Sequence, residues 1–155
     1  MPSFNKIPET RHLLRDLAVH AAHRELRPVF RLNETQRLPR RAWDFQPTEG
    51  LVNLAQAVML RLLTPRGELA DLGHPEYGSR VHELIGQENN RSKRNLLKLF
   101  ILEALKQEPR VEKVAQLDVV PSPGARSTVD VLLRVKPVGA SELVTIGPFA
   151  IELAV

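Results

Sequence analysis

The spacing of hydrophobic residues changes once along this chain, near Arg110, and this change constrains the fold more than any other feature. Before it, between Leu51 and Leu63, apolar residues recur at i, i+3, i+4 and i+7, which is the period of an amphipathic helix. After it, apolar residues occupy every second position, which is the period of a β-strand. The sequence therefore predicts an α+β fold with a helical N-terminal half of about three helices, followed by a small antiparallel β-meander.

Two long helices and one short helix are predicted ahead of the strands. On the first of them, Asn53, Gln56 and Arg61 lie opposite the apolar stripe. The last helix ends near Pro109, because proline disfavours helical geometry in the residue before it. The predicted segments are residues 51–63, 79–85 and 92–107.

The last of these helices is apolar on most of its circumference. Between Leu96 and Leu105, only Lys98 and Glu103 interrupt the apolar run. A helix of this kind needs neighbours on most sides, and a domain of this size can hardly surround one completely. The excess apolar face is a candidate interface with another chain, and ordinary core packing is the alternative.

The C-terminal part alternates apolar and polar residues in three segments, with a weaker fourth segment around residues 143–146. Proline and glycine separate the segments, and Gly147-Pro148 predicts the last turn. No charged residue follows the last segment, although proteins usually protect a sheet edge with charge, proline or a covering segment. If this segment lies at an edge, another chain can add a strand to it. The alternative is a position between two strands of its own sheet.

The excess positive charge is confined to the first third of the chain. Residues 1–46 contain nine Lys and Arg against five Asp and Glu, whereas residues 47–155 contain thirteen of each. We interpret residues 1–47 as a basic, proline-interrupted arm, with a possible short helix from Thr10 to about Arg27. Trp43 and Phe45 are its candidate anchors on a neighbouring protein, and packing on their own domain is the alternative.

The amino-acid composition limits the kinds of reaction and bonding that the chain can support. The chain has no cysteine, which excludes disulfides, thiol nucleophiles and cysteine-ligated zinc. No apolar run is long enough for a membrane span, and no signal peptide is recognisable, so we expect a protein that folds in the cytoplasm. We expect no catalytic residue, no cofactor and no metal.

Two other functions stay open at this point. The arginines of the arm together with Trp43 or Phe45 suggest a nucleic-acid-binding module, although acidic residues are interspersed among them. Several acidic residues around the middle of the chain suggest a carboxylate-dependent peptidoglycan hydrolase, although acidic loop residues are more often solvated. These carboxylates are Glu68, Asp71, Glu76 and Glu83.

Six short motifs follow one another in a fixed order along the second part of the chain. They are Asn53-Leu54-Ala55-Gln56-Ala57, Leu62-Leu63-Thr64-Pro65-Arg66-Gly67-Glu68, His74-Pro75-Glu76-Tyr77-Gly78-Ser79-Arg80, Glu83-Leu84-Ile85-Gly86, Glu103-Ala104-Leu105 and Glu108-Pro109-Arg110-Val111. This set resembles the baseplate wedge and sheath-initiator family of contractile phage tails and phage-tail-like contractile injection systems, the lysozyme-like wedge proteins. The resemblance covers residues 48–155, the expected α+β sheath-initiator-like domain, and leaves the arm unmatched.

The resemblance implies a structural protein, present in six copies, that joins the inner baseplate wedge to the first sheath ring. It implies that Glu108, Pro109 and Arg110 contact the helical core bundle of the wedge. It also implies that the C-terminal strands template sheath assembly by accepting strands from sheath subunits. The residues expected at that edge are Phe149, Ile151, Leu153 and Val155.

The partners implied are baseplate wedge proteins, the first ring of sheath subunits, and inner tube or spike-hub proteins. Neither a membrane nor a nucleic acid is expected among them. The protein is expected in the bacterial cytoplasm during assembly and then in the baseplate of the finished particle. The Glu-Pro-Arg motif also occurs in the type VI secretion branch, whereas the Leu62–Gly67 and His74–Ser79 motifs look more like extracellular injection systems.

Overall fold

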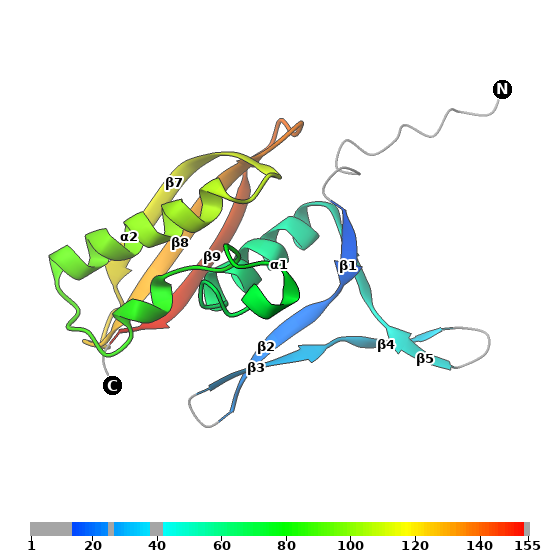
Figure 1. The fold of residues 1–155 in the computed structure, drawn as a ribbon, viewed down its shortest axis with the longest axis horizontal. Helices are drawn as coiled ribbons and strands as arrows, with labels where there is room; N and C mark the ends of the chain where they lie inside the picture. Colours follow the sequence, from blue (N-terminus) through cyan, green and yellow to red (C-terminus); the bar gives the residue numbers. More distant parts are fainter. Residues whose placement is uncertain (1–13, 25–26, 38–41, 154–155) are drawn as a thin grey trace. The chain divides into compact units, whose positions relative to one another are not determined.

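The structure is a computed structural model that describes residues 14–24, 27–37 and 42–153 (Figure 1). The chain divides into two compact units, Met1–Gln56 and Ala57–Val155. This boundary falls inside helix α1 (Gly50–Leu63). The described residues contain two α-helices, and the second is α2 (Arg91–Lys106).

The described part of the first unit is built from three two-stranded antiparallel ribbons. Each ribbon pairs two short strands, and the β2–β3 and β4–β5 ribbons point away from the stem formed by β1 and β6 (Figure 1). The strands are β1 (Arg15–Leu17), β2 (Val19–Arg24), β3 (Arg27–Leu32), β4 (Glu34–Arg37), β5 (Ala42–Phe45) and β6 (Pro47–Glu49).

The three ribbons meet at a closed ring of backbone hydrogen bonds. Ala18 N–H donates to Gln46 O at 2.7 Å, Gln46 N–H donates to Asn33 O at 2.7 Å, and Asn33 N–H donates to Ala18 O at 2.8 Å. The amide of Gln56 in α1 completes the junction, since it donates to Leu17 O at 2.9 Å and accepts from Val19 N–H at 2.8 Å. The polar backbone groups at the junction therefore have partners although no sheet continues through it.

The expected helical N-terminal half of about three helices is wrong. Residues 15–17 and 19–24, which the expected helix from Thr10 to Arg27 would contain, form strands β1 and β2; Thr10 itself lies outside the described residues. The expected short helix at 79–85 is a single 3-10 turn, η3 (Val81–Leu84). The described residues form strands first, then two α-helices, and then a three-stranded sheet at the C-terminal end.

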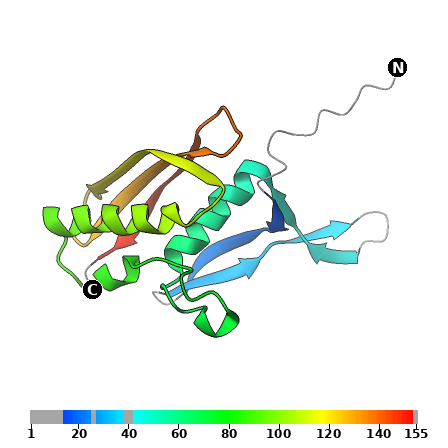
Figure 2. The ribbon, with the colours of Figure 1, turned by 45° about the horizontal axis from the view of Figure 1, so that its top comes forward.

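The second unit packs α2 along a three-stranded antiparallel sheet with the order β7–β8–β9 (Figure 2). The strands are β7 (Val111–Pro121), β8 (Thr128–Pro137) and β9 (Val144–Glu152). A side chain of Asn90 caps α2 by accepting from Lys93 N–H at 2.9 Å. A second 3-10 turn, η2 (Ala70–Leu72), lies in the loop between α1 and η3.

The core of this unit follows directly from the two hydrophobic periods. Every second residue of β8 is fully buried, and α2 buries residues at i, i+4 and i+8. Each of these side chains contributes about 1.5–3 kcal/mol by leaving water. They are Val129, Val131, Leu133 and Val135 in β8, and Leu97, Ile101 and Leu105 in α2.

Strand β9 is continuous where the sequence predicted a turn. Val144 and Ile146 pair with β8, and so do Phe149 and Ile151 beyond Gly147-Pro148. The irregularity at this point appears as a register shift opposite Val131–Leu133 rather than a chain reversal. The prediction of a turn here, which separated a weak fourth strand from the last one, is therefore wrong.

Candidate functional site

Glu108 lies at the centre of a buried ionic cluster where α2 gives way to β7. Its Oε2 lies 3.3 Å from a guanidinium nitrogen of Arg61 in α1, and its Oε1 accepts from Arg110 Nε at 2.6 Å. Arg61 and Glu108 are both buried, so removing either partner would leave an uncompensated buried charge. The Arg61–Glu108–Arg110 cluster joins the end of one helix to the beginning of the sheet.

Arg61 is further held by an aromatic ring. Its guanidinium carbon lies 4.4 Å from the centroid of Tyr77, and its Nε is buried without a hydrogen-bond partner among the described residues. The sequence placed Arg61 and Asn53 opposite the apolar stripe of α1, yet both are buried. Arg61 is buried because it pairs with Glu108, which lies 47 residues away in the sequence. No local sequence pattern indicates such a pair.

The pKa of Glu108 is lowered in the folded protein. Burial raises this pKa, but the hydrogen bond from Arg110 and the charges of Arg110 and Arg61 outweigh burial. A carboxylate whose folded pKa lies below its unfolded pKa contributes stability at neutral pH. That contribution is lost as the pH falls below the ordinary glutamate pKa of about 4.3 and through the lowered value.

We therefore expect the free energy of unfolding to fall when the pH is lowered from 7 to 3, and Glu108→Gln to flatten this dependence. The measurement is the urea midpoint of the wild type and the variant at closely spaced pH values. The neutral variant is expected to be less stable at pH 7, so the comparison uses the slope against pH rather than the absolute stability. Equal slopes in the two proteins would contradict the role assigned to Glu108.

The four carboxylates considered for a hydrolase are exposed, and two of them are paired with arginines. Arg66 contacts Glu76 and, at 2.6 Å, Glu103, and Arg80 donates to both oxygens of Glu83 at 2.8 and 2.9 Å. The hydrogen bond from Arg80 lowers the pKa of Glu83. A glycosidase acid needs a raised pKa instead, so this arrangement does not provide the acid. Glu68 and Asp71 lie exposed in the loop that contains η2.

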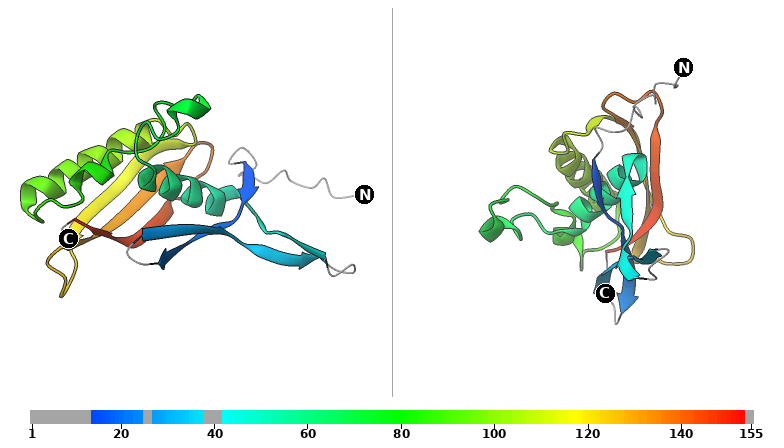
Figure 3. Two further views of the ribbon diagram at one scale, coloured as in Figure 1. Left: turned by 60° about the horizontal axis from the view of Figure 1, so that its bottom comes forward. Right: turned by 90° about the vertical axis from the view of Figure 1, so that its right-hand side faces the viewer.

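Strand β9 is at the edge of its sheet, as Figure 3 also shows. Leu153 N–H donates to Ser127 O at 2.8 Å, in the same register that pairs Ile151 with Val129. In an antiparallel ladder, hydrogen-bonded pairs alternate with pairs whose backbone groups point away from the partner strand. The backbone groups of Ala150 and Glu152 therefore point to the open edge.

The residues predicted at this edge differ in their surroundings. Phe149 and Ile151 lie in β9 and are half-buried. Leu153 follows the strand and is fully buried, with its carbonyl oxygen accepting from Gly86 N–H. Val155 lies outside the described residues. The open part of the edge is thus the strand itself, up to Glu152.

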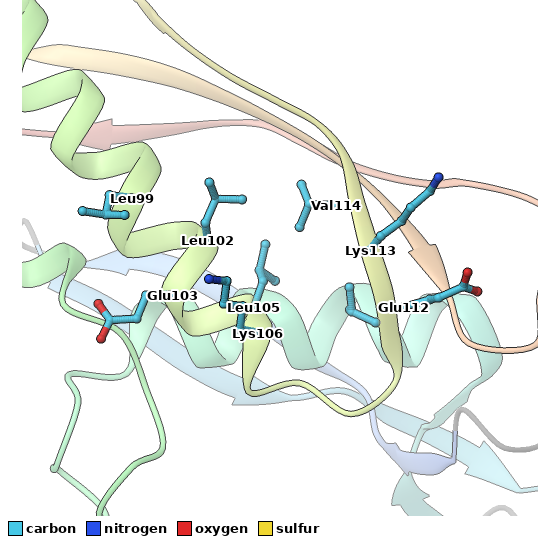
Figure 4. A pocket seen from close by; sticks show the side chains of 9 residues that line it. Leu99, Leu102, Glu103, Leu105, Lys106, Glu112, Lys113 and Val114 are labelled. Carbon is cyan, nitrogen blue, oxygen red and sulfur yellow. The ribbon is translucent and has the colours of Figure 1, made fainter.

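A groove of about 590 Å³ lies between α2 and β7. Figure 4 shows Leu99 and Leu102 on the helix and Val114 on the strand. Leu99 is 58% exposed, so the excess apolar face expected for this helix is present. The charged residues of the lining are Glu103, Lys106, Glu112 and Lys113.

Trp43 and Phe45 lie on β5, two residues apart, so they share one face of the β4–β5 ribbon. Trp43 is 70% exposed and Phe45 is 43% exposed. Among the described residues of the first unit, neither ring is buried in a core. Two large exposed rings on one face are typical of a contact surface.

The structure brings Glu108 and Arg110 together, and adds Arg61 and Tyr77, which sequence reasoning did not select. Pro109 lies between them at the surface and is exposed. In the part of the chain that the structure describes, three or more metal-binding side chains do not converge anywhere. No described helix has the length and apolar character that crossing a bilayer requires.

Comparison with models of known protein families and with curated protein sequences finds no match. Among solved structures, the chain is similar to the crystal structure of a "putative tail lysozyme" from Geobacter sulfurreducens. The TM-score is 0.56 and the sequence identity is 18%, over 66% of this chain and 89% of that chain. At this identity the similarity shows a shared fold.

Proposed function

We propose that this protein is a structural component of a contractile injection system or phage tail. In this role it joins the inner baseplate wedge to the first sheath ring and templates sheath assembly by accepting strands along β9. The observation that carries the proposal is the open edge of β9, where the backbone groups of Ala150 and Glu152 point away from β8. The fold shared with the "putative tail lysozyme" supports the same assignment.

Strand addition fits the physical character of this edge. Its side chains alternate between half-buried and exposed from Phe149 to Glu152, so an incoming strand finds apolar contacts on one face. In such contacts, main-chain hydrogen bonds provide the affinity and alternate side chains provide the specificity. Six copies on one ring would act together, so each individual contact can be modest.

The second contact of the proposed role is with the wedge. Glu108 uses both of its oxygens inside its own chain, on Arg61 and Arg110. Its part in a wedge contact is therefore to hold Arg110, whose guanidinium suits a bidentate contact with a partner carboxylate. The exposed Pro109 keeps this segment from continuing α2 and so presents Arg110 in one direction.

Ala150→Pro tests the strand-addition role. Because the N–H of Ala150 points to the open edge and its side chain is exposed, proline removes one edge donor without breaking a bond to β8. We expect the free energy of unfolding of this variant to lie within about 1 kcal/mol of the wild-type value. We also expect it to reduce sheathed particles at least tenfold when it replaces the wild type in assembling cells, counted by electron microscopy.

Ala150→Thr is the matched control, since it changes the same side chain and keeps the N–H. This variant is expected to assemble sheath like the wild type. Normal numbers of sheathed particles with Ala150→Pro would refute strand addition at this edge. Failure of both variants to fold would instead show that the edge is not open as described.

A further inference from the structure

We propose that the groove between α2 and β7 binds an amphipathic helix of a partner protein, with the apolar ridge of that helix in the groove and its acidic side chains facing Lys106 and Lys113. The groove lies at the opposite edge of the sheet from β9, because β7 and β9 are the two edge strands. It therefore does not depend on strand addition at β9.

The groove presents apolar surface that the described residues leave uncovered. Leu99 is 58% exposed, and Leu102, Val111 and Val114 are half-buried along the two walls. Leu105 is fully buried beneath them. The charged ends of Glu103, Glu112 and Lys113 point away from Leu102 and Val114 (Figure 4). Nothing in the floor would orient a small polar ligand, whereas an apolar ridge finds contacts along the whole length.

The shape of the two walls favours a helix over a strand. The pairing of β7 with β8 shifts register twice at this end, between Val111 and Lys113 and between Val114 and Gln116. Such irregularities interrupt the regular ladder that an added strand would need, and proteins use them to protect edges. The other wall is itself a helix.

On α2, Leu99, Leu102 and Lys106 are spaced at i, i+3 and i+7, so they form a ridge along the exposed side of the helix. Ridges of this kind pack into the grooves of a second helix. Binding of an amphipathic helix in an apolar groove uses anchors with the same spacing. The α2 wall is therefore complementary to another helix.

The charges at the rim determine which helix fits best. The two acidic residues are already paired, Glu103 with Arg66 at 2.6 Å and Glu112 with Lys136 at 2.8 Å. Lys106 and Lys113 are exposed, and across residues 14–24, 27–37 and 42–153 no carboxylate lies within ion-pair distance of either. The uncompensated charge is positive, so glutamate and aspartate beside the apolar ridge are favoured, and lysine is disfavoured.

Two synthetic helical peptides test the proposal with the full chain. Both carry the same leucine ridge, which is flanked by glutamate in one peptide and by lysine in the other, and binding is measured by fluorescence anisotropy. We expect the glutamate peptide to bind at least tenfold more tightly. Leu99→Glu is expected to weaken its binding at least tenfold, and the double change Lys106→Glu with Lys113→Glu to reverse the preference between the peptides.

Leu72→Glu is the matched control, because Leu72 is also an exposed leucine, at 73%, but lies in η2 outside the groove. It should leave the affinity unchanged. Equal affinities for the two peptides, no binding of either, or binding that survives Leu99→Glu would overturn the proposal. The sheath phenotype of Ala150→Pro is read separately in particles, so failure of one proposal is distinguishable from failure of the other.

Discussion

Glu108→Ala is expected to lower the free energy of unfolding by about 3–5 kcal/mol, measured by urea denaturation at pH 7. The loss of stability is expected because the substitution leaves Arg61 without its carboxylate partner. Arg61 is buried, and its contact with Glu108 at 3.3 Å is the ion pair that the structure records for it. Without that carboxylate, a positive charge stays in a poorly solvated place, and the hydrogen bond that holds Arg110 is also lost.

Two comparisons separate this effect from a general loss of contacts. Glu112→Ala removes an exposed carboxylate paired with Lys136, and such surface pairs contribute less than about 1 kcal/mol. The double variant Arg61→Met with Glu108→Leu removes both buried charges and keeps similar volume. It should recover most of the lost stability, because paired buried charges can be replaced by apolar groups at little cost. Glu108→Ala as stable as the wild type would refute the central role of Glu108.

Gly78→Ala is expected to destabilise the protein by roughly 3 kcal/mol or more, through strain and overlap combined. Gly78 has a φ of +106°, which L residues rarely adopt. A Cβ at this position would lie 2.5 Å from Thr64 O and 2.8 Å from Pro65 O, and both are backbone atoms that cannot turn aside. The measurement is the urea midpoint of the variant. An m-value equal to that of the wild type checks that unfolding stays two-state.

Gly73→Ala is the matched control for this change. Gly73 also has a positive φ, +85°, but a Cβ there meets nothing within 4 Å. It should cost only the conformational strain of about 1–2 kcal/mol. Equal losses in the two variants would mean that the close approach at Gly78 does not constrain the loop.

The physical importance of Gly78 comes from the neck of the loop between α1 and η3. Ser79 N–H donates to Thr64 O at 2.8 Å, and Arg66 N–H donates to Ser79 O at 2.9 Å, so the two sides of the neck lie in direct contact. The Ser79 hydroxyl adds a bond to Leu62 O at 2.6 Å. This neck places Tyr77 over Arg61, and so connects the loop to the ionic cluster.

How far the fold could be predicted differs between the two parts of the chain. Residues 51–63 and 92–107 were expected as helices, and α1 and α2 occupy these segments because their apolar stripes and the Asn90 cap are local features. The expected helix in the arm is wrong because β1 and β2 depend on distant partners. Arg15 pairs with Glu49 and Val19 with Leu32, and such pairing leaves no local signal in a segment that also suits a helix.

The candidate site shows the same division. The Glu108-Pro109-Arg110 motif was selected from a resemblance, and the contact of these residues with a wedge bundle stays a prediction. Arg61 was not selected, since an arginine on an amphipathic helix normally faces solvent. Leu153 was expected at an open edge, but its backbone is bonded to Ser127 and Gly86. In the strand before it, the backbone groups of Ala150 and Glu152 point away from β8.

By itself, the amino-acid sequence determined helix α2 and the alternating strands β7 and β8, because those preferences act within a few residues. The tertiary structure alone decided that Arg61 is buried against Glu108, that β9 runs through Gly147 without turning, and that the described part of the arm forms strand ribbons. Each of these depends on groups that are far apart in sequence. Their energies exist only once the chain has brought them together.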